Sequence, residues 1–287
     1  MTDGVTERAR VLVACADATG VVAAVAGFLA DHGANILEAD QHTDPDTRQF
    51  FMRVEFETAG LRTGLDALAQ DFTAIAKRFD MDARVEPARR RRVAVLCSKQ
   101  THCVADLLWR ATTDELEAEL AMVVSNHTDA KPFAAQLGVP FHHMPVSPDT
   151  KDAQHAAMLR LLVDSDIELV VLARYMQVVP PSFVEAFGDR IINIHHSFLP
   201  AFAGAKPYHQ AFAKGVKLIG ATAHYVTAEL DEGPIIAQQT EPVTHRDAVA
   251  DMVRSGRDLD RVVLARAVRL HLAGKVRVHA GRTIVFD

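Results

Sequence analysis

The sequence has little cysteine, few aromatic residues and no long apolar run. Its 287 residues include three cysteines, an odd number at spacings that match neither a disulfide framework nor a zinc-binding Cys-x-x-Cys pair. Aromatic residues make up 6%, and no stretch of about 18 uncharged apolar residues, as a membrane span needs, occurs. The opening residues, MTDGVTERAR, lack the basic-then-apolar layout of a signal peptide. We therefore expect a cytoplasmic protein that has no membrane partner.

An excess of positive charge is also absent. The formal net charge is −6, so no global basic field exists to gather the phosphates of a nucleic acid. Four consecutive arginines, Arg89 to Arg92, form the one basic run, and no aromatic residues are interleaved with them. Charge blocks of this kind are usually solvated. We interpret the run as a linker and expect no nucleic-acid partner.

Length and composition predict two globular domains of unequal size. Hydrophobic residues make up 49% and charged residues 24% of the 287 positions, and domains average roughly 150 residues. The first 80 or so residues predict a βαββαβ order, which is typical of a ferredoxin-like sheet with helices on one face. The predicted elements are a strand at Ala9–Cys15, a helix that ends at Gly33, a hairpin of Asn35–His42 and Gln49–Phe56, a helix at Leu61–Phe79 and a strand at Asp82–Val85.

The chain after the arginines alternates short apolar strands with helical stretches. This alternation is typical of a mostly parallel α/β sheet covered on both faces. We expect strands at Val93–Cys97, Glu119–Ser125, Phe141–Met144, Glu168–Leu172 and Arg190–Ile194, with a helix at Lys151–Asp164. The last third predicts the strands Gly220–Val226 and Pro234–Gln239, the long helix His245–Leu272 and two short terminal strands. The predicted division is a first domain at 1–87, a linker at 88–92 and a Rossmann-like second domain at 93–287.

The segment NIHHSFLP, Asn193 to Pro200, is the richest in chemistry, because it lies at the carboxyl end of a predicted parallel strand, where open α/β sheets bind ligands. Side chains alternate across a strand, so Asn193 and His195 project to the same side. An amide can donate to a developing oxyanion, and an imidazole can move a proton near neutrality. The alternative is structural, with the amide capping a turn and the imidazole bonded to backbone.

A second polar segment, the loop that follows the strand Gly220–Val226, carries Glu229, Asp231 and Glu232. A loop carboxylate that reached His195 would fix its tautomer and support its charged form. We select Asp231, which follows the apolar Leu230. His224, on the strand that leads to this loop, either faces the same cavity or is a hydrogen-bonded core residue.

These segments together resemble the formyltetrahydrofolate-dependent formyltransferases, whose members carry an Asn-x-His on one strand and an Asp in a later loop. The matching positions are Asn193, His195 and Asp231 within NIHHSFLPAF and TAHYVTAELDEGPIIAQ. Within that group, the chain resembles the formyltetrahydrofolate deformylases through GAKPYHQAF, LARYMQVV, SKQTHC and its N-terminal unit. The segment Asp17–His42 resembles ACT domains, which are small regulatory modules that often bind amino acids.

The resemblance implies hydrolysis of 10-formyltetrahydrofolate to tetrahydrofolate and formate, which would balance one-carbon pools for purine synthesis. Asp231 would orient His195 and help to deprotonate water, His195 would stabilise the oxyanion and relay the proton, and Asn193 would donate to the same oxygen. The sequence leaves open which of His195 and Asp231 takes the proton. The resemblance implies that the folate is the substrate rather than a cofactor, and we expect no cofactor and no metal, because no ligand spacing such as His-Glu-x-x-His occurs.

The resemblance places the pterin ring against Ala173–Val179, where Met176 and Val178 are the expected contacts. Ordinary packing explains their spacing equally well. Lys206, Tyr208 and His209 are expected to line the formyl side of the site, with a purely structural turn as the alternative. Small sheets have edges that favour pairing between subunits, so a homo-oligomer, dimer or tetramer, is expected, with an amino-acid effector at the first domain.

Two other functions stay open. A formyltransferase of this fold with a phosphorylated acceptor would place a glycine-rich turn after the first strand of the second domain. This chain has CSKQTHC there, without glycine, which favours water as the acceptor. A catalytically silent amino-acid sensor is the third possibility, and the intact set of Asn193, His195 and Asp231 argues against it.

Overall fold

The computed structural model describes residues 7–201 and 207–287. The chain divides into two units, and the division differs from the expected one. The first unit comprises the chain up to Arg89 together with Ala273–Lys275 and Phe286–Asp287. The second comprises Arg90–Leu272 and Val276–Val285. Two short C-terminal segments, expected in the second domain, therefore belong to the first unit.

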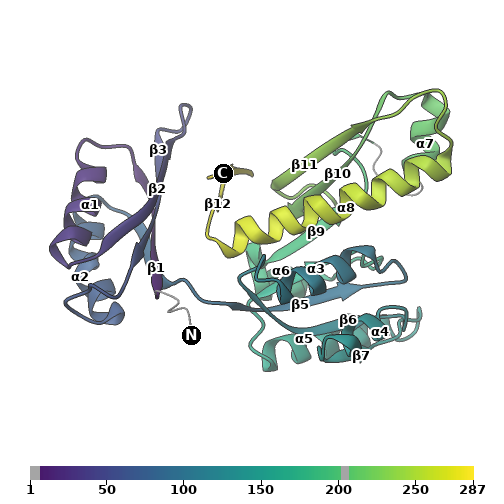
Figure 1. The fold of residues 1–287 in the computed structure, drawn as a ribbon, viewed down its shortest axis with the longest axis horizontal. Coiled ribbons are helices and arrows are strands. Elements are labelled where there is room, and N and C mark those ends of the chain that lie inside the picture. Colours follow the sequence, from purple (N-terminus) through teal and green to yellow (C-terminus); the bar gives the residue numbers. More distant parts are fainter. Residues whose placement is uncertain (1–6, 202–206) are drawn as a thin grey trace. The chain divides into compact units, whose positions relative to one another are not determined.

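The first unit has the βαββαβ order that the hydrophobic pattern predicts (Figure 1). Its elements are β1 (Arg8–Ala16), α1 (Val21–Asp31), β2 (Asn35–Thr43), β3 (Gln49–Glu57), α2 (Leu65–Arg78) and β4 (Asp82–Pro87). The four strands form an antiparallel sheet in the order β2-β3-β1-β4. Alternate residues of β1 and β3, such as Val11 and Val54, form one core with Val25 of α1 and Leu68 of α2. The period of two in the strands thus matches the apolar stripe of the helices.

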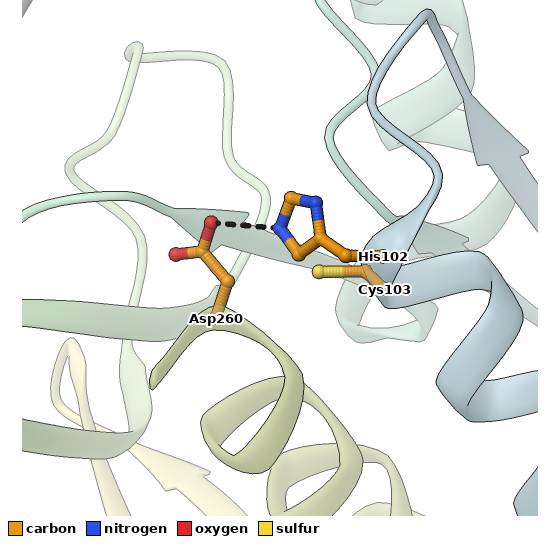
Figure 2. A group of neighbouring side chains, drawn as sticks. All are labelled: His102, Cys103 and Asp260. Atoms are coloured by element: carbon orange, nitrogen blue, oxygen red, sulfur yellow. Dashed lines mark hydrogen bonds and ion pairs between the residues drawn. The ribbon is translucent and has the colours of Figure 1, made fainter. Parts of the chain in front are cut away.

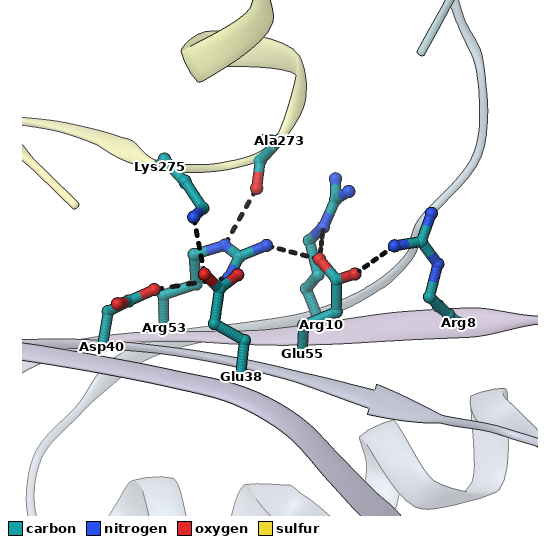
Figure 3. A network of polar contacts seen from close by, with 8 residues as sticks. All are labelled: Arg8, Arg10, Glu38, Asp40, Arg53, Glu55, Ala273 and Lys275. Atoms are coloured by element: carbon teal, nitrogen blue, oxygen red, sulfur yellow. Dashed lines mark hydrogen bonds and ion pairs between the residues drawn. The ribbon is translucent and has the colours of Figure 1, made fainter. Parts of the chain in front are cut away.

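The other residues of these strands carry a network of charges in which Arg10, Arg53 and Glu55 are buried (Figure 3). Glu55 accepts from Arg10 Nε at 2.9 Å, and it also bonds Arg53 and Arg8. Burial alone would raise the pKa of Glu55, but the hydrogen bond from Arg10 and the charges of the three arginines outweigh burial and lower the pKa. Arg53 Nε donates to Ala273 O at 2.9 Å, and Lys275 bonds Glu38 at 2.7 Å. These two contacts explain why residues 273–275 belong to the first unit.

The second unit is built on a seven-stranded sheet in the order β11-β10-β9-β8-β5-β6-β7. The strands β5 to β9 run parallel, and β10 and β11 continue the sheet antiparallel. Because β6 and β8 flank β5 on opposite sides, the strand order reverses between β5 and β8, and a crevice is expected at the carboxyl ends of these strands. The strands are β5 (Arg91–Cys97), β6 (Ala118–Ser125), β7 (Phe141–His143), β8 (Leu169–Leu172), β9 (Ile191–His195), β10 (Leu218–Tyr225) and β11 (Ile235–Pro242), and β12 (Val276–His279) pairs separately with β13 (Arg282–Val285).

Helices cover both faces of this sheet. Val93 and Val95 of β5 contribute to a core with helices α3, α7 and α8, and Ala94 and Leu96 face a second core with α5 and α6. The helices are α3 (His102–Thr112), α4 (Lys131–Gln136), α5 (Lys151–Asp164), α6 (Pro181–Phe187), α7 (Pro207–Lys214) and α8 (Val249–Leu272), with a short 3-10 turn, η1, at Gly188–Arg190. The expected fold class, a ferredoxin-like unit followed by a mostly parallel α/β unit, is confirmed.

Most strand boundaries differ from the predicted ones by one to three residues, and three differences have a clear local cause or consequence. Helix α2 begins at Leu65 rather than Leu61, because Leu61 closes a turn onto Thr58 O at 3.0 Å. Helix α8 begins at Val249 rather than His245, since the preceding backbone bonds the Asp247 carboxylate instead. The last two arginines of the expected linker are the first residues of β5. Among the described residues, no helix is both long enough and apolar enough to cross a membrane.

Candidate active site

The end of β9 presents the two residues that the strand period places together. Asn193 is half-buried and His195 is 6% exposed. The turn that follows is held by Thr222 of β10, whose hydroxyl donates to Ser197 O at 2.9 Å and accepts from Leu199 N at 3.0 Å. These bonds fix the backbone directly after His195 and thereby fix the direction of its ring.

Asp231 reaches His195 from the loop between β10 and β11. Its Oδ2 lies 3.1 Å from His195 Nδ1. The backbone of Asp231 is left-handed, at φ 59°, a conformation that aspartate tolerates better than most residues. Gly233 lies so close to the carbonyl of Tyr225 that a Cβ would collide with it, so glycine there lets the loop fold back over β10. The hydrogen bond from His195, with a smaller effect of the nearby His224 ring, holds the pKa of Asp231 well below its ordinary value.

His224 sets the orientation of Asn193. Its Nδ1 lies 2.8 Å from the carbonyl oxygen of Tyr225, which can only accept, so Nδ1 carries a proton. In the neutral ring Nε2 is then an acceptor, and Asn193 Nδ2 donates to it over 3.1 Å. His224 Nε2 also lies 3.7 Å from Asp231 Oδ1. The amide group of Asn193 is thus fixed with its second N–H available.

A cavity of about 400 Å³ opens beside these side chains. Asn193, His195, His224 and Asp231 line its polar end. Met176 and Val178, the expected pterin contacts, also line it, and both are more than half exposed. Ser98, in the turn after β5, bonds the backbone N–H of Met176 at 3.0 Å and thereby holds this wall. The volume is within the range of small-molecule sites.

The other expected site residues are placed differently. Tyr208 lines a neighbouring, more apolar cavity of about 370 Å³, which shares His196 with the first. His209 is exposed on α7 and lines neither of these two cavities. Lys206 lies outside the described residues. Burial, with a smaller effect of the Arg174 charge, lowers the pKa of His196 to about 4, which leaves this ring neutral.

A group of buried polar residues beside the first cavity was not expected. Arg174 lines the cavity, and its Nε lies 3.7 Å from Asp260 Oδ2 of α8. His102 Nε2 lies 3.2 Å from the same oxygen, and Cys103 completes the group shown in Figure 2. The ligand atoms of His102, Cys103 and Asp260 lie within 4.8 Å of one another, as metal ligands could, but a cation there would be repelled by the Arg174 guanidinium. The one signal in the sequence is an arginine two residues after a buried strand.

The arrangement can accept and return a proton next to an oxyanion. The Asp231 carboxylate accepts from His195 Nδ1–H, so Nε2 of the neutral ring is a base, and Nε2 of the charged ring is an acid. That Nε2 is buried and has no hydrogen-bond partner within the described residues. With the free N–H of Asn193, it suits attack on a carbonyl carbon followed by protonation of a leaving group.

Comparison with known proteins identifies the family of each unit. Residues 91–268 match the formyl transferase family, and residues 9–73 match the ACT domain family. The formyltetrahydrofolate deformylase of Bacillus subtilis is 48% identical over 287 residues, which cover 99% of this chain and 96% of that protein. The formyltetrahydrofolate deformylase of Escherichia coli K12 is 41% identical over 271 residues, which cover 94% of this chain and 95% of that protein.

A solved structure matches the whole architecture. The crystal structure of a formyltetrahydrofolate deformylase from Pseudomonas syringae has a TM-score of 0.96 and 46% identity, and the match covers 100% of this chain and 96% of that chain. Because curated relatives and a solved structure agree over nearly the full length of both units, the chain belongs to the formyltetrahydrofolate deformylase family of hydrolases.

Proposed function

We propose that this protein hydrolyses 10-formyltetrahydrofolate to tetrahydrofolate and formate through Asn193, His195 and Asp231. The observation that carries the mechanism is the Nε2 of His195, which has no partner among the described residues, lies opposite the Asp231 contact and belongs to the same cavity wall as Asn193. The family supports the substrate, since the relatives are named for formyltetrahydrofolate. The exposed side chains of Met176 and Val178 supply an apolar wall against which a pterin ring can stack.

In the first step a water molecule attacks the formyl carbon, and its proton passes to His195 Nε2. Asp231 is a weak base, because its pKa is held below the ordinary value. It therefore stabilises the imidazolium that forms, and His195 accepts the proton. The carbonyl oxygen becomes an alkoxide, and the free N–H of Asn193 donates to it. A donor of this kind can contribute about 10²–10³-fold to the rate.

In the second step His195 returns the proton from Nε2 to the folate nitrogen. The carbon–nitrogen bond then breaks, tetrahydrofolate leaves with its nitrogen protonated, and the formic acid loses a proton to solvent. His224 takes no part in proton transfer, because its two nitrogens are committed to the carbonyl of Tyr225 and to the amide of Asn193. Its role is to position Asn193.

The turn after β5 supports water as the acceptor. Ser98 is 3% exposed, and its hydroxyl bridges Asn126 Oδ1 at 2.7 Å and the Met176 N–H at 3.0 Å. A side chain therefore occupies the turn at which a glycine-rich loop could bind a phosphorylated acceptor. A formyltransferase with a small-molecule acceptor is the alternative, and this turn disfavours it.

The test is formate release from 10-formyltetrahydrofolate without any added acceptor, in the presence of a chelator. We expect turnover by the wild type and its loss in His195→Ala. Asn193→Ala is expected to lower kcat by about 10²-fold, since it removes one oxyanion donor. Formate release that requires a phosphorylated amine would favour the transferase, and a requirement for metal would overturn the expectation that no metal takes part.

The wider role proposed for the enzyme is to supply formate and to balance one-carbon folate pools for purine synthesis, with an amino acid as effector at the first unit. The match to the ACT family supports the effector. A homo-oligomer is also proposed, because β2 is an exposed edge strand on which Ile36 and Leu37 are at least one-third exposed. Formate release measured across a panel of amino acids, and light scattering of the full chain, test these two points.

A further inference from the structure

Arg174 is the one residue of the cavity wall that the proposed steps do not use and that carries a permanent positive charge. Among the described residues that line this cavity, the charged groups besides Arg174 are the carboxylates of Glu229 and Asp231 and the titratable histidines. A buried cation in a substrate cavity needs an anionic partner, either from the protein or from a ligand.

The backbone directs Arg174 toward the reacting groups. Leu172 of β8 pairs in parallel register with Asn193 of β9, and Arg174 follows Leu172 by two residues, as His195 follows Asn193. Arg174 is left-handed, at φ 63°, a conformation that is uncommon for a residue with a long side chain. Such backbone conformations cluster at functional sites. Arg174 lies in the cavity wall that also contains His195 and His196, and its charge is close enough to His196 to lower the pKa of that ring.

The guanidinium is only partly neutralised by the protein. Its Nε lies 3.7 Å from Asp260 Oδ2, beyond hydrogen-bond distance, and the Arg174 side chain is 12% exposed. Asp260 is itself buried, and His102 Nε2 lies 3.2 Å from the same Oδ2 (Figure 2). No hydrogen bond joins the Arg174 guanidinium to any described residue, and its buried Nε is among the atoms without such a partner. Within this part of the chain its terminal N–H donors are therefore available to a ligand.

The proposed reaction makes an anion in the cavity that Arg174 lines. A neutral formamide enters, and formate leaves with a negative charge on a carboxylate. Among side chains, the planar guanidinium matches a carboxylate best, because it forms paired charge-assisted hydrogen bonds with the two carboxylate oxygens. The same match must not become too strong, since the product has to leave before the next turnover.

We propose that Arg174 binds the product formate through its terminal nitrogens, and that Asp260 weakens this binding so that formate can leave; this inference rests on the proposed function. Asp260 is a positioning residue. It holds the guanidinium from the Nε side and reduces the positive field that formate meets, and His102 keeps the Asp260 carboxylate in place.

The experiment is calorimetric titration of sodium formate into the substrate-free full chain at constant ionic strength, with chloride as the balancing anion. Arg174→Met alone would leave Asp260 buried without its cation, so the informative variant is Arg174→Met with Asp260→Asn. Methionine keeps the length of the side chain and meets the same left-handed backbone cost. We expect this double variant to raise the Kd for formate by about tenfold or more, as the loss of charge-assisted hydrogen bonds implies.

Asp260→Asn alone gives the opposite expectation. Asparagine keeps the shape of the side chain and can still bond His102, but it leaves the Arg174 charge uncompensated. The Kd for formate is then expected to fall several-fold, and product inhibition by formate to grow in proportion. A merely structural role for Asp260 would weaken binding or leave it unchanged. Asp258→Asn, on the exposed face of the same helix, is the matched control and should not alter the Kd.

The outcomes separate this inference from the proposed function. An enzyme that releases formate from its substrate but shows no saturable formate binding, or the same Kd in the double variant, overturns the role of Arg174 and leaves the hydrolysis in place. Asp260→Asn without tighter formate binding overturns the role of Asp260. A wild type that binds formate through Arg174 but never hydrolyses the folate overturns the proposed function instead.

Discussion

Asp231→Asn is the sharpest test of the proposed mechanism, because it removes one charge and keeps the shape of the side chain. In the transition state His195 is protonated, and its Nδ1 faces Asp231 Oδ2 at 3.1 Å. Two unit charges at that distance attract by roughly 5 kcal/mol at an effective dielectric constant of about 20. Asparagine can still accept the Nδ1 hydrogen bond and recovers part of this energy. Since about 1.4 kcal/mol is a factor of ten, we expect kcat to fall on the order of 10³-fold.

The assay is single-turnover formate release, which separates the chemical step from product release. KM should change little, because Asp231 stabilises charge that develops only in the transition state. Glu232→Gln is the control: it removes a carboxylate from the neighbouring, exposed position of the same loop and should leave kcat near the wild-type value. A loss of less than tenfold in Asp231→Asn, or an equal loss in both variants, would refute the assignment of Asp231 as the partner of a charged His195.

Three further predictions concern stability. The pKa of His196 is about 4 in the folded protein and 6.5 in an unperturbed histidine. As pH falls from 6.5 to 4, the wild type is therefore expected to lose up to about 3 kcal/mol of unfolding free energy relative to His196→Gln. Urea denaturation at several pH values measures this loss, and the same pH dependence of stability in both proteins would contradict it. Gly256→Ala places a Cβ against the Tyr208 hydroxyl and should lower the free energy of unfolding by about 1–3 kcal/mol. Gly27→Ala has open space around it and should raise the free energy of unfolding by about 0.5–1 kcal/mol. Calorimetric melting must therefore show a lower Tm for the first variant and a higher Tm for the second. Glu55→Gln leaves the buried guanidinium groups of Arg10 and Arg53 without their shared carboxylate and should lower the free energy of unfolding by about 3–5 kcal/mol. Hydrogen exchange should show this as lost protection in the first unit. A decrease below about 1 kcal/mol would show that the network is not needed for stability.

Local patterns were sufficient for the parts of the site that lie on one strand or loop. Asn193 and His195 are two residues apart on β9, so the alternation of side chains by itself predicts that both project to the same side. Asp231 was selected among three acids because it follows an apolar residue, and it is the acid that reaches His195. In both cases the residues that carry the signal lie within two positions of each other in the sequence.

The parts that sequence reasoning missed join residues far apart in the chain. His102 and Asp260 are separated by 158 positions, and each by itself is an ordinary polar residue on a helix. Arg174 lies in an apolar segment, and its sequence neighbours do not mark it. Only the parallel pairing of β8 with β9 brings it to the same end of the sheet as His195. Tyr208 and His209 were expected together at the catalytic site, but successive helical residues point in different directions, so one is buried against a second cavity and the other is exposed.

The contacts of Arg53 with Ala273, and of Glu38 with Lys275, span 220 and 237 positions of the sequence. During synthesis the strands of the first unit leave the ribosome early, and N-terminal units generally begin to fold as they emerge. Its core can form at that stage, but two groups do not yet exist: the carbonyl of Ala273, which accepts from Arg53, and the ammonium of Lys275, which donates to Glu38. The charged face of the first unit is therefore completed only when almost the whole chain has been translated. A chain that stalls before residue 273 has a first unit whose core can fold but whose Arg53 and Glu38 lack the partners at residues 273 and 275.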